Sequence, residues 1–337
     1  MTPDPDLDLL TAVARGIVDL SERIRPSAFR LPYPPGLQLA LDRLVLKALR
    51  AGTPVPGGVA GLLAWCGTPL TDLRWPLALP PGLLSEDAAL IDPEVAEPTR
   101  TCAELASIGP HGELERSAEA LMANLADTCG TPERFDACRD FLISRPVMLR
   151  PDPVELLRPT NAATWKLVKD LYAPVPERMV VDRSVSCCLR CGLLAKALPG
   201  AGTWCEGRCP VPEPERSEQP ARAVALPLGL RLFTALPGRT EAELRRRLGP
   251  TPGGRRARTA RRLLVLDREQ PALAARRAAE LAGNDRPSDV VLPDHLADRP
   301  GYRQRFRAAL PLGADIVLHS VTDYTASANG RPRRTSA

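Results

Sequence analysis

The sequence contains no run of about 18 or more apolar residues, which is the length that a helix needs to cross a lipid bilayer. Its first residues, MTPDPDLDLL, are acidic and lack the basic and then apolar order of a secretory signal peptide. Apolar residues make up 44% and charged residues 25% of the 337 residues, as in soluble globular proteins. We therefore expect a cytoplasmic protein of two or three domains with no membrane partner.

The motifs that identify common catalytic sites are also missing. There is no GxxxxGK[ST] phosphate loop, no GxGxxG after a strand, no GxSxG and no HExxH. The three histidines, His111, His295 and His319, are far apart in sequence, and each is expected to be a surface or capping residue rather than a ligand. These patterns assign no catalytic residue.

Lysine is scarce, because only four of the 45 basic residues are lysines and none follows Lys196. Residues 1–180 carry 18 basic and 24 acidic side chains, whereas the rest of the chain carries 27 basic and 16 acidic ones. A basic C-terminal half could bind nucleic acid. The excess of arginine, with abundant alanine and proline, equally fits a GC-rich coding bias that places arginine on solvated surfaces. Both interpretations stay open.

Residues 1–180 are predicted to form a mostly helical region, because apolar residues recur there at helical spacing. Thr131-Pro132-Glu133 has the residue types of a helix start, and Gly130 is typical of the end of the preceding helix. The proline-rich residues 66–100 are expected to be mainly loop. The predicted helices span residues 6–24, 37–50, 113–126, 131–146 and 161–172.

Residues 239–320 have a different pattern, in which apolar segments alternate with segments of helical periodicity. Strands at 262–266, 289–292 and 314–318 with intervening helices predict a small parallel α/β sheet. Thr240-Glu-Ala-Glu243 has the form of a capping box that starts a helix. Residues 211–238 are rich in proline and charge and are predicted to be a linker, and 321–337 a disordered tail.

Five of the nine cysteines occur in residues 187–209, CCLRCGLLAKALPGAGTWCEGRC. Cys188 and Cys191 form one short-spaced pair, and Cys205 and Cys209 form a second pair. Two such pairs are typical of a Cys₄ zinc site, and in a cytosolic protein clustered cysteines more often bind metal than form disulfides. Because four protein ligands fill the tetrahedral shell of zinc, we predict a structural zinc ribbon over 181–210.

Cys187 is expected to be a fifth, non-ligating thiol, although it could replace Cys188 as a ligand. The zinc module could serve as a structural brace, bind nucleic acid through Arg190 and Arg208, or dock a protein, and the structural role is favoured. The other cysteines fall mostly on apolar helix faces and are expected to be core residues. They are Cys66, Cys102, Cys129 and Cys138.

Several segments resemble a known bacterial family: LPYPPGLQLALDRLVLKALRAG, LLAWCGTPL, RFDACRDFLISRPV, and LYAPVPER before the cysteine cluster. They are similar to the restriction-endonuclease-like proteins of PIWI-RE three-gene defence islands, which occur beside a prokaryotic PIWI protein and a helicase. Residues 290–311 also resemble the closing part of that family's nuclease-like domain, so the resemblance spans most of residues 25–311. It implies an α+β multi-domain protein with a helical N-terminal region, a zinc ribbon and a C-terminal restriction-endonuclease-like domain over 239–320. The implied partners are a PIWI-family protein, a helicase and invading DNA.

The sequence departs from this family at the nuclease site. The family carries an Asp-x-Lys strand before an Ala/Leu-rich helix and another acid on the preceding strand, and such carboxylates hold Mg²⁺. When the sequences are aligned on Pro271, Leu264 and Leu266 occupy the Asp and Lys places, and 244–266 contains no acid. We therefore expect a degenerate, accessory domain with no catalytic residue. One alternative is an active nuclease with Mg²⁺ at Asp267 and Glu269, and another is a zinc-braced interaction scaffold.

Arginines occupy the interval where the acids are missing. Near a sheet edge their charges could neutralise DNA phosphates, whereas the scarcity of aromatic residues argues against base stacking. An equal alternative is that this segment is a loop that binds no ligand, and that its arginines only reflect the GC-rich coding bias. The candidate nucleic-acid-binding residues are Arg245, Arg246, Arg247, Arg255, Arg256, Arg258, Arg261 and Arg262.

Overall fold

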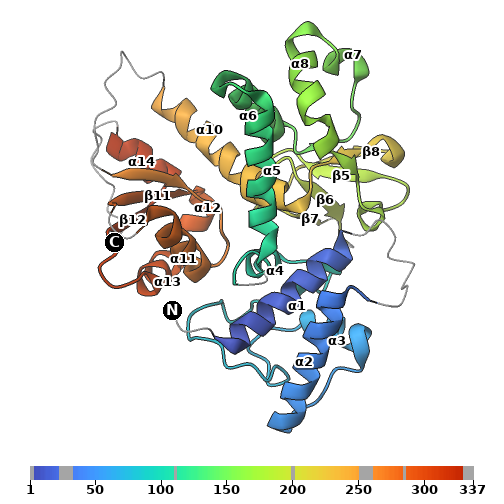
Figure 1. Ribbon diagram of the computed structural model, residues 1–337, viewed down its shortest axis with the longest axis vertical. Helices are drawn as coiled ribbons and strands as arrows, with labels where there is room; N and C mark the ends of the chain where they lie inside the picture. The colour runs from blue at the N-terminus through green and yellow to red at the C-terminus, as the bar shows by residue number, and fades with distance from the viewer. Residues whose placement is uncertain are drawn as a thin grey trace. The chain divides into compact units, whose positions relative to one another are not determined.

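The chain forms two compact units, which are Met1–Leu79 with Glu86–Ala235, and Pro80–Ser85 with Leu236–Ala337. They are called unit 1 and unit 2 (Figure 1). Each unit has apolar core clusters of its own. No helix in the part of the chain described is long and apolar enough to cross a membrane. The computed structural model describes residues 4–22, 33–109, 112–198, 202–249, 261–283 and 286–328.

Unit 1 begins with helices that the apolar periodicity predicts. α1 (Pro5–Ser21) starts at Asp4, whose carboxylate accepts the backbone N–H groups of Asp6 and Leu7 at 3.0 and 3.2 Å. This contact supplies partners for two of the N–H groups that a helix start leaves free. α1 packs against α2 (Pro35–Ala51) and α4 (Arg100–Leu105), and α3 (Gly58–Cys66) follows α2.

The second helical group of unit 1 contains α5 (Glu113–Cys129), α6 (Pro132–Ser144) and α8 (Pro159–Val168), which share an apolar core. The predicted boundary between α5 and α6 is confirmed. Gly130 follows α5 with φ 71°, and the Thr131 side chain accepts the backbone N–H of Arg134 at 3.4 Å. Glycine tolerates this left-handed conformation because it has no Cβ.

Short elements complete the scaffold of unit 1. β1 and β2 form an antiparallel hairpin, and β3, β9 and β4 form an antiparallel sheet in that order. The short strands are β1 (Ile91–Asp92), β2 (Glu97–Pro98), β3 (Val147–Met148), β4 (Ala173–Pro174) and β9 (Val224–Ala225). The short helices are α7 (Pro153–Leu156), η1 (Lys169–Leu171), η2 (Glu177–Met179), η3 (Pro220–Arg222), α9 (Leu228–Leu230) and the π-helix η4 (Arg231–Ala235).

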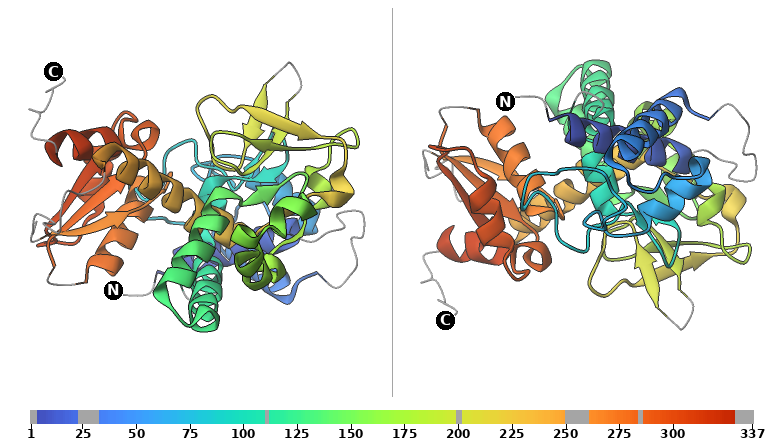
Figure 2. Two further views of the ribbon diagram at one scale, coloured as in Figure 1. Left: turned by 90° about the horizontal axis from the view of Figure 1, so that it is seen from above. Right: turned by 90° about the horizontal axis from the view of Figure 1, so that it is seen from below.

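The cysteine-rich segment folds into an antiparallel sheet, seen in yellow-green and yellow in Figure 2. Its strand order is β7-β6-β5-β8. One face contributes Val185, Leu194 and Trp204 to a core that also contains Val147 and Val175. The strands are β5 (Val185–Cys188), β6 (Leu194–Ala197), β7 (Thr203–Cys205) and β8 (Pro214–Ser217).

The prediction of a linker over 211–238 is wrong. β8, within this segment, pairs with β5, and Ser217 is fully buried and accepts a hydrogen bond from Arg150 Nε at 3.2 Å. The exposed Pro214, Glu215 and Arg216 gave the segment its linker-like composition. Because β8 is an edge strand, it tolerates proline and charge that a central strand would not.

Unit 2 contains the parallel sheet that the sequence predicts, with β10 (Arg262–Val265), β11 (Ser288–Leu292) and β12 (Ile316–Ser320) in sequential order. The third strand begins two residues later than predicted. Helices cover both faces of the sheet, α11 and α13 on one and α10 and α14 on the other (Figures 1 and 2). The helices are α10 (Leu236–Leu248), α11 (Pro271–Ala282), α12 (Asp294–Ala297), α13 (Tyr302–Ala309) and α14 (Val321–Ala328). The predicted mixed helix-and-sheet architecture is confirmed.

Two local predictions in unit 2 are wrong. Thr240 does not start a helix, because it is buried inside α10 and its hydroxyl donates to the Leu236 carbonyl at 3.4 Å. Residues 321–328 form α14 rather than disordered tail, and residues 329–337 lie outside the described part. The Asp294 carboxylate accepts the backbone N–H and the hydroxyl of Thr322 at 2.9 and 2.7 Å, which satisfies the start of α14.

Candidate metal centre

The first knuckle, residues 188–191, follows the end of β5. The backbone N–H of Cys188 donates to the carbonyl of Leu193 at 2.8 Å, and that of Gly192 donates to the carbonyl of Cys188 at 2.6 Å. Gly192 has φ 73°, a conformation that favours glycine. The resulting tight turn brings Cys191 back beside Cys188.

The second knuckle, residues 205–209, follows the end of β7. The backbone N–H of Arg208 donates to the carbonyl of Cys205 at 3.0 Å, and that of Cys209 donates to the Sγ of Cys205 at 3.3 Å. β6 pairs with both β5 and β7, so the two knuckles lie at the same end of the sheet.

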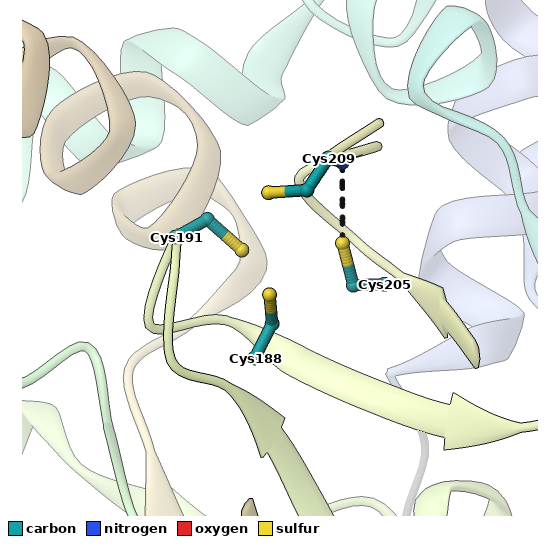
Figure 3. A group of neighbouring side chains, drawn as sticks. All are labelled: Cys188, Cys191, Cys205 and Cys209. Carbon is teal, nitrogen blue, oxygen red and sulfur yellow. Dashed lines mark hydrogen bonds between the residues drawn. The ribbon is translucent and has the colours of Figure 1, made fainter. Parts of the chain in front are cut away.

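The sulfur atoms of Cys188, Cys191, Cys205 and Cys209 all lie within 4.8 Å of one another. Figure 3 shows the four sulfurs directed toward a common centre. Three of these cysteines are buried and Cys209 is half-buried. Within the described ranges, no other group of three or more His, Cys, Asp or Glu side chains is placed to hold a metal. The predicted ligand set is therefore brought together by the fold.

The chemistry of the four thiols fits a divalent metal ion that binds thiolates, such as Zn²⁺. Hydrogen bonds from the thiols of Cys191, Cys205 and Cys209 lower the pKa of Cys188, and the same crowding with Cys188 raises the pKa of Cys191. The pKa of Cys205 is also lowered and that of Cys209 is raised, so two of the four thiols favour the thiolate and two oppose it. A cation that binds deprotonated sulfur removes this conflict, because it neutralises the charge that the thiolates would otherwise share.

Cys187 is excluded from this ligand set by the geometry of β5. Successive side chains of a strand point to opposite faces, so Cys187 faces away from Cys188. It lies in the core with Val185, Leu194 and Trp204, and its Sγ is 4.0 Å from a carboxylate oxygen of Glu215. The alternative in which Cys187 replaces Cys188 is therefore wrong.

The remaining cysteines are core residues, as predicted. Cys66, Cys102, Cys129 and Cys138 are all buried. Burial raises the pKa of Cys66 and Cys102, so these thiols stay protonated.

The two arginines inside the knuckles contact the protein itself. Arg190 donates to the carbonyl of Val211 at 3.3 Å and lies 3.6 Å from the Glu213 carboxylate. Arg208 pairs with Asp92 at 3.0 Å. These contacts support the structural role of the knuckles over phosphate binding.

Sequence reasoning missed a group of charged side chains beside the second knuckle. The Glu206 carboxylate accepts hydrogen bonds from Nε and Nη2 of Arg231 at 2.9 and 2.7 Å, and Arg178 pairs with Glu22 at 3.2 Å. These residues are so far apart in sequence that no spacing signals their contact. The group comprises Glu22, Glu97, Arg178, Lys196, Glu206 and Arg231.

In unit 2, the positions that the family resemblance assigns to nuclease residues are part of the core. Leu264 and Leu266 are each 6% exposed and belong to the apolar cluster between the sheet and helices α11 and α13. Asp267 is buried, and Glu269 lies 3.3 Å from the guanidinium of Arg299.

The candidate nucleic-acid-binding arginines that the structure describes are divided between the two ends of the parallel strands. Arg247 donates to the Thr322 hydroxyl at 2.9 Å, beyond the carboxyl end of β11 and β12. Arg261 pairs with Asp289 at 2.8 Å and Asp315 at 2.7 Å, toward the amino ends of the same strands. Arg245 pairs with Glu241, Arg262 donates to the carbonyl of Leu281, and Arg246 is exposed. Arg255, Arg256 and Arg258, like His111, lie outside the described residues.

Comparison with protein families gives a match to the first part of the chain. Residues 9–149 match the family described as pPIWI_RE three-gene island domain Y, which covers less than half of the chain. The match begins in α1 and ends just after β3. No curated protein and no solved structure matches the chain.

Proposed function

We propose that the chain is the restriction-endonuclease-like component of a bacterial PIWI-RE three-gene island, acting with the island's other products against invading DNA. The observation that carries this proposal is the match of residues 9–149 to domain Y of such an island. The resemblance of the cysteine cluster and of residues 290–311 to the same family extends the argument beyond the matched part.

In this proposal the four clustered cysteines hold one zinc ion in a zinc ribbon. Zinc with four thiolate ligands has no open position for substrate or water, so its contribution is to cross-link the ends of β5 and β7. The backbone N–H that Cys209 donates to the Sγ of Cys205 at 3.3 Å supports this use, because such contacts orient and stabilise thiolate ligands.

Unit 2 is proposed to be a catalytically degenerate nuclease-like domain. Its support is the burial of Leu264 and Leu266, since a carboxylate and an ammonium at these positions would need to enter an apolar core. The Glu269–Arg299 pair also supports a structural use of the acids that follow β10.

We further propose that the chain acts mainly by binding the island's proteins rather than DNA. Arg245, Arg247 and Arg261 are each paired with a carboxylate, and Arg247 and Arg261 lie toward opposite ends of the strands. Arginines held in this way are less available for phosphates than free side chains of one continuous basic surface.

The partner proposal is tested by purifying the tagged full chain from its native host, with the whole island expressed. After the lysate is treated with a non-specific nuclease, we expect mass spectrometry to identify the island's PIWI protein or its helicase in the purified sample. Loss of both after nuclease treatment would assign the association to DNA. Recovery of neither protein, with or without nuclease, would overturn the proposed membership.

The catalytic alternative is tested with purified protein, plasmid and linear DNA, and Mg²⁺. We expect no cleavage above that of a mock purification. Asp267→Asn serves as the site variant and Asp298→Asn as its matched control, because Asp298 is exposed and pairs with Arg303. Cleavage by the unmodified chain that is lost in Asp267→Asn and kept in Asp298→Asn would replace the degenerate interpretation with an active nuclease.

A further inference from the structure

The second knuckle contains Glu206, Gly207 and Arg208 between its two cysteines, and each of them contacts a different part of unit 1. Glu206 binds Arg231 of η4, as described above. The carbonyl of Gly207 accepts a hydrogen bond from Arg100 Nη1 of α4 at 3.4 Å. Arg208 Nη1 donates to a carboxylate oxygen of Asp92 in β1 at 3.0 Å. The knuckle therefore joins the metal centre to three elements that are distant in sequence.

Two of these contacts, those of Glu206 and of Gly207, involve charged side chains that are almost fully buried, whereas Arg208 is 37% exposed. The side chains of Arg231, Glu206 and Arg100 are 1%, 6% and 2% exposed. Burial opposes the charge of Arg231, but Glu206 and Glu22 together raise its pKa. A buried ion is tolerated only where partners replace the water that it has lost. The stability of η4 therefore depends on where the second knuckle places the Glu206 carboxylate.

The shape of the second knuckle in turn depends on its cysteines. Arg208 has φ 52°, which is a strained conformation for a residue that carries a Cβ. The hydrogen bonds that close the loop both end on Cys205, one at its carbonyl oxygen and one at its Sγ. A metal that binds Cys205 and Cys209 would fix both ends of this loop and hold the strained residue in place.

The first knuckle contacts a different part of the chain, the segment between the second knuckle and β8. Leu189 is 58% exposed, and its backbone N–H donates to the carbonyl of Glu213 at 2.8 Å. Arg190 contacts Val211 and Glu213, both in the segment between the second knuckle and β8. The second knuckle thus contacts α4, β1 and η4, and the first contacts the segment before β8.

We propose that the second knuckle transmits metal binding to α4, the β1–β2 hairpin and η4, so that these segments are held in the observed arrangement only while the metal centre is loaded. This inference rests on the zinc site of the proposed function. Glu206 is the positioning residue for Arg231. The segment that matches the island family, which contains Arg100 and Asp92, is thereby coupled to the metal.

The test compares the purified full chain loaded with zinc and after chelation, with metal content measured on each sample. Hydrogen–deuterium exchange followed by mass spectrometry should show about tenfold or faster exchange in 91–105 and 226–235 after chelation, because these segments lose buried ionic partners. α2 serves as the internal comparison, because its main contacts are with α1 and α3 and its residues do not share a core cluster with 226–235, and we expect little change there. Equal loosening of α2 would mean that the metal only braces unit 1 as a whole, and would overturn the inference.

A second measurement avoids chelation. Glu206→Gln keeps the size of the side chain but removes the charge that pairs with Arg231, whereas Glu213→Gln changes the corresponding exposed carboxylate beside the first knuckle. With one zinc bound in each variant, we expect faster exchange in 226–235 for Glu206→Gln only. Unchanged exchange in zinc-loaded Glu206→Gln would overturn the inference while leaving the zinc site intact. A chain that binds no zinc would instead refute the metal site of the proposed function.

Discussion

At the scale of single residues, the thiols of this chain differ in what determines their pKa. Burial and the neighbouring Cys129 raise the pKa of Cys138 to about 12, and the two sulfurs lie 3.7 Å apart. The protonation of the four clustered cysteines is instead determined by one another and by the ion that they are proposed to hold. The same residue type therefore serves as core packing in α6 and as a proposed metal ligand at the ends of β5 and β7.

This difference predicts a pattern of alkylation. In the zinc-loaded chain, iodoacetamide should leave Cys138 unmodified at pH 7 and at pH 9, because both values lie below its folded-state pKa and the unfolded chain is rare. After chelation, Cys209 should react, because it is only half-buried. Peptide mapping by mass spectrometry distinguishes the two sites. Labelling of Cys138 in the folded chain at pH 9 would contradict the assignment.

The clustering of the four cysteines could be predicted from the sequence because their spacing is short and their chemistry is specific. Cys187 and Cys188 could not be separated in that way, since only the direction of side chains on β5 shows which of them faces the other knuckle. The Glu206–Arg231 pair gave no signal at all. Buried ion pairs depend on tertiary placement, which residue spacing does not encode.

At the scale of helices and strands, the residue preferences at helix ends predicted the boundaries correctly where no other element was involved. The end of α5 at Gly130 and the start of α6 at Thr131 follow from the conformational preferences of those residues. β8 was missed because its exposed residues resemble a linker, and Thr240 was misplaced because tertiary packing extends α10 in front of it. In both cases the structure depends on a neighbouring element, which is β5 for β8 and the preceding η4 for α10.

The helix boundary at Gly130 gives a stability prediction. Gly130→Ala should lower the free energy of unfolding by about 1 kcal/mol, because alanine is strained at φ 71°. No atom lies within 4 Å of the added Cβ, so backbone conformation alone causes the loss. Denaturant unfolding measures the change.

Gly36→Ala is the matched control for this substitution. Gly36 lies in the first turn of α2, its added Cβ also meets no atom within 4 Å, and its backbone is not in the left-handed region. We expect no loss, or a gain of up to about 1 kcal/mol, since alanine favours a helix more than glycine does. Equal destabilisation by both variants would show that φ at Gly130 is not the cause.

At the scale of the whole molecule, the two units have separate cores, and the proposed metal centre belongs to unit 1 alone. The parallel sheet of unit 2 was predictable because three apolar segments alternate with helical ones at regular spacing. The proposal that unit 2 is nuclease-like could not be reached by that reasoning, because many unrelated functions share small α/β folds.

Separate cores predict unequal consequences of metal loss. After chelation, limited proteolysis should cut unit 1 first, and a C-terminal fragment that contains 262–328 should persist, because its core includes no metal ligand. Intact-mass analysis of the fragments over time measures the order of cleavage. Digestion of both units at the same rate, faster than in the loaded chain, would show that they unfold together.

The positions of the four lysines determine how the partners of this chain can be mapped. Lys196, on β6, contacts Glu97, and Lys47 pairs with Asp6 on α1 at 2.7 Å. Lys166 and Lys169 are exposed, near the end of α8 and in η1. Amine-reactive cross-linkers will therefore react mainly in one small area of unit 1, and they will form no lysine cross-links in unit 2, which contains no lysine. Carboxylate-directed or photoactivated cross-linkers will be needed to find an interface anywhere else on the chain.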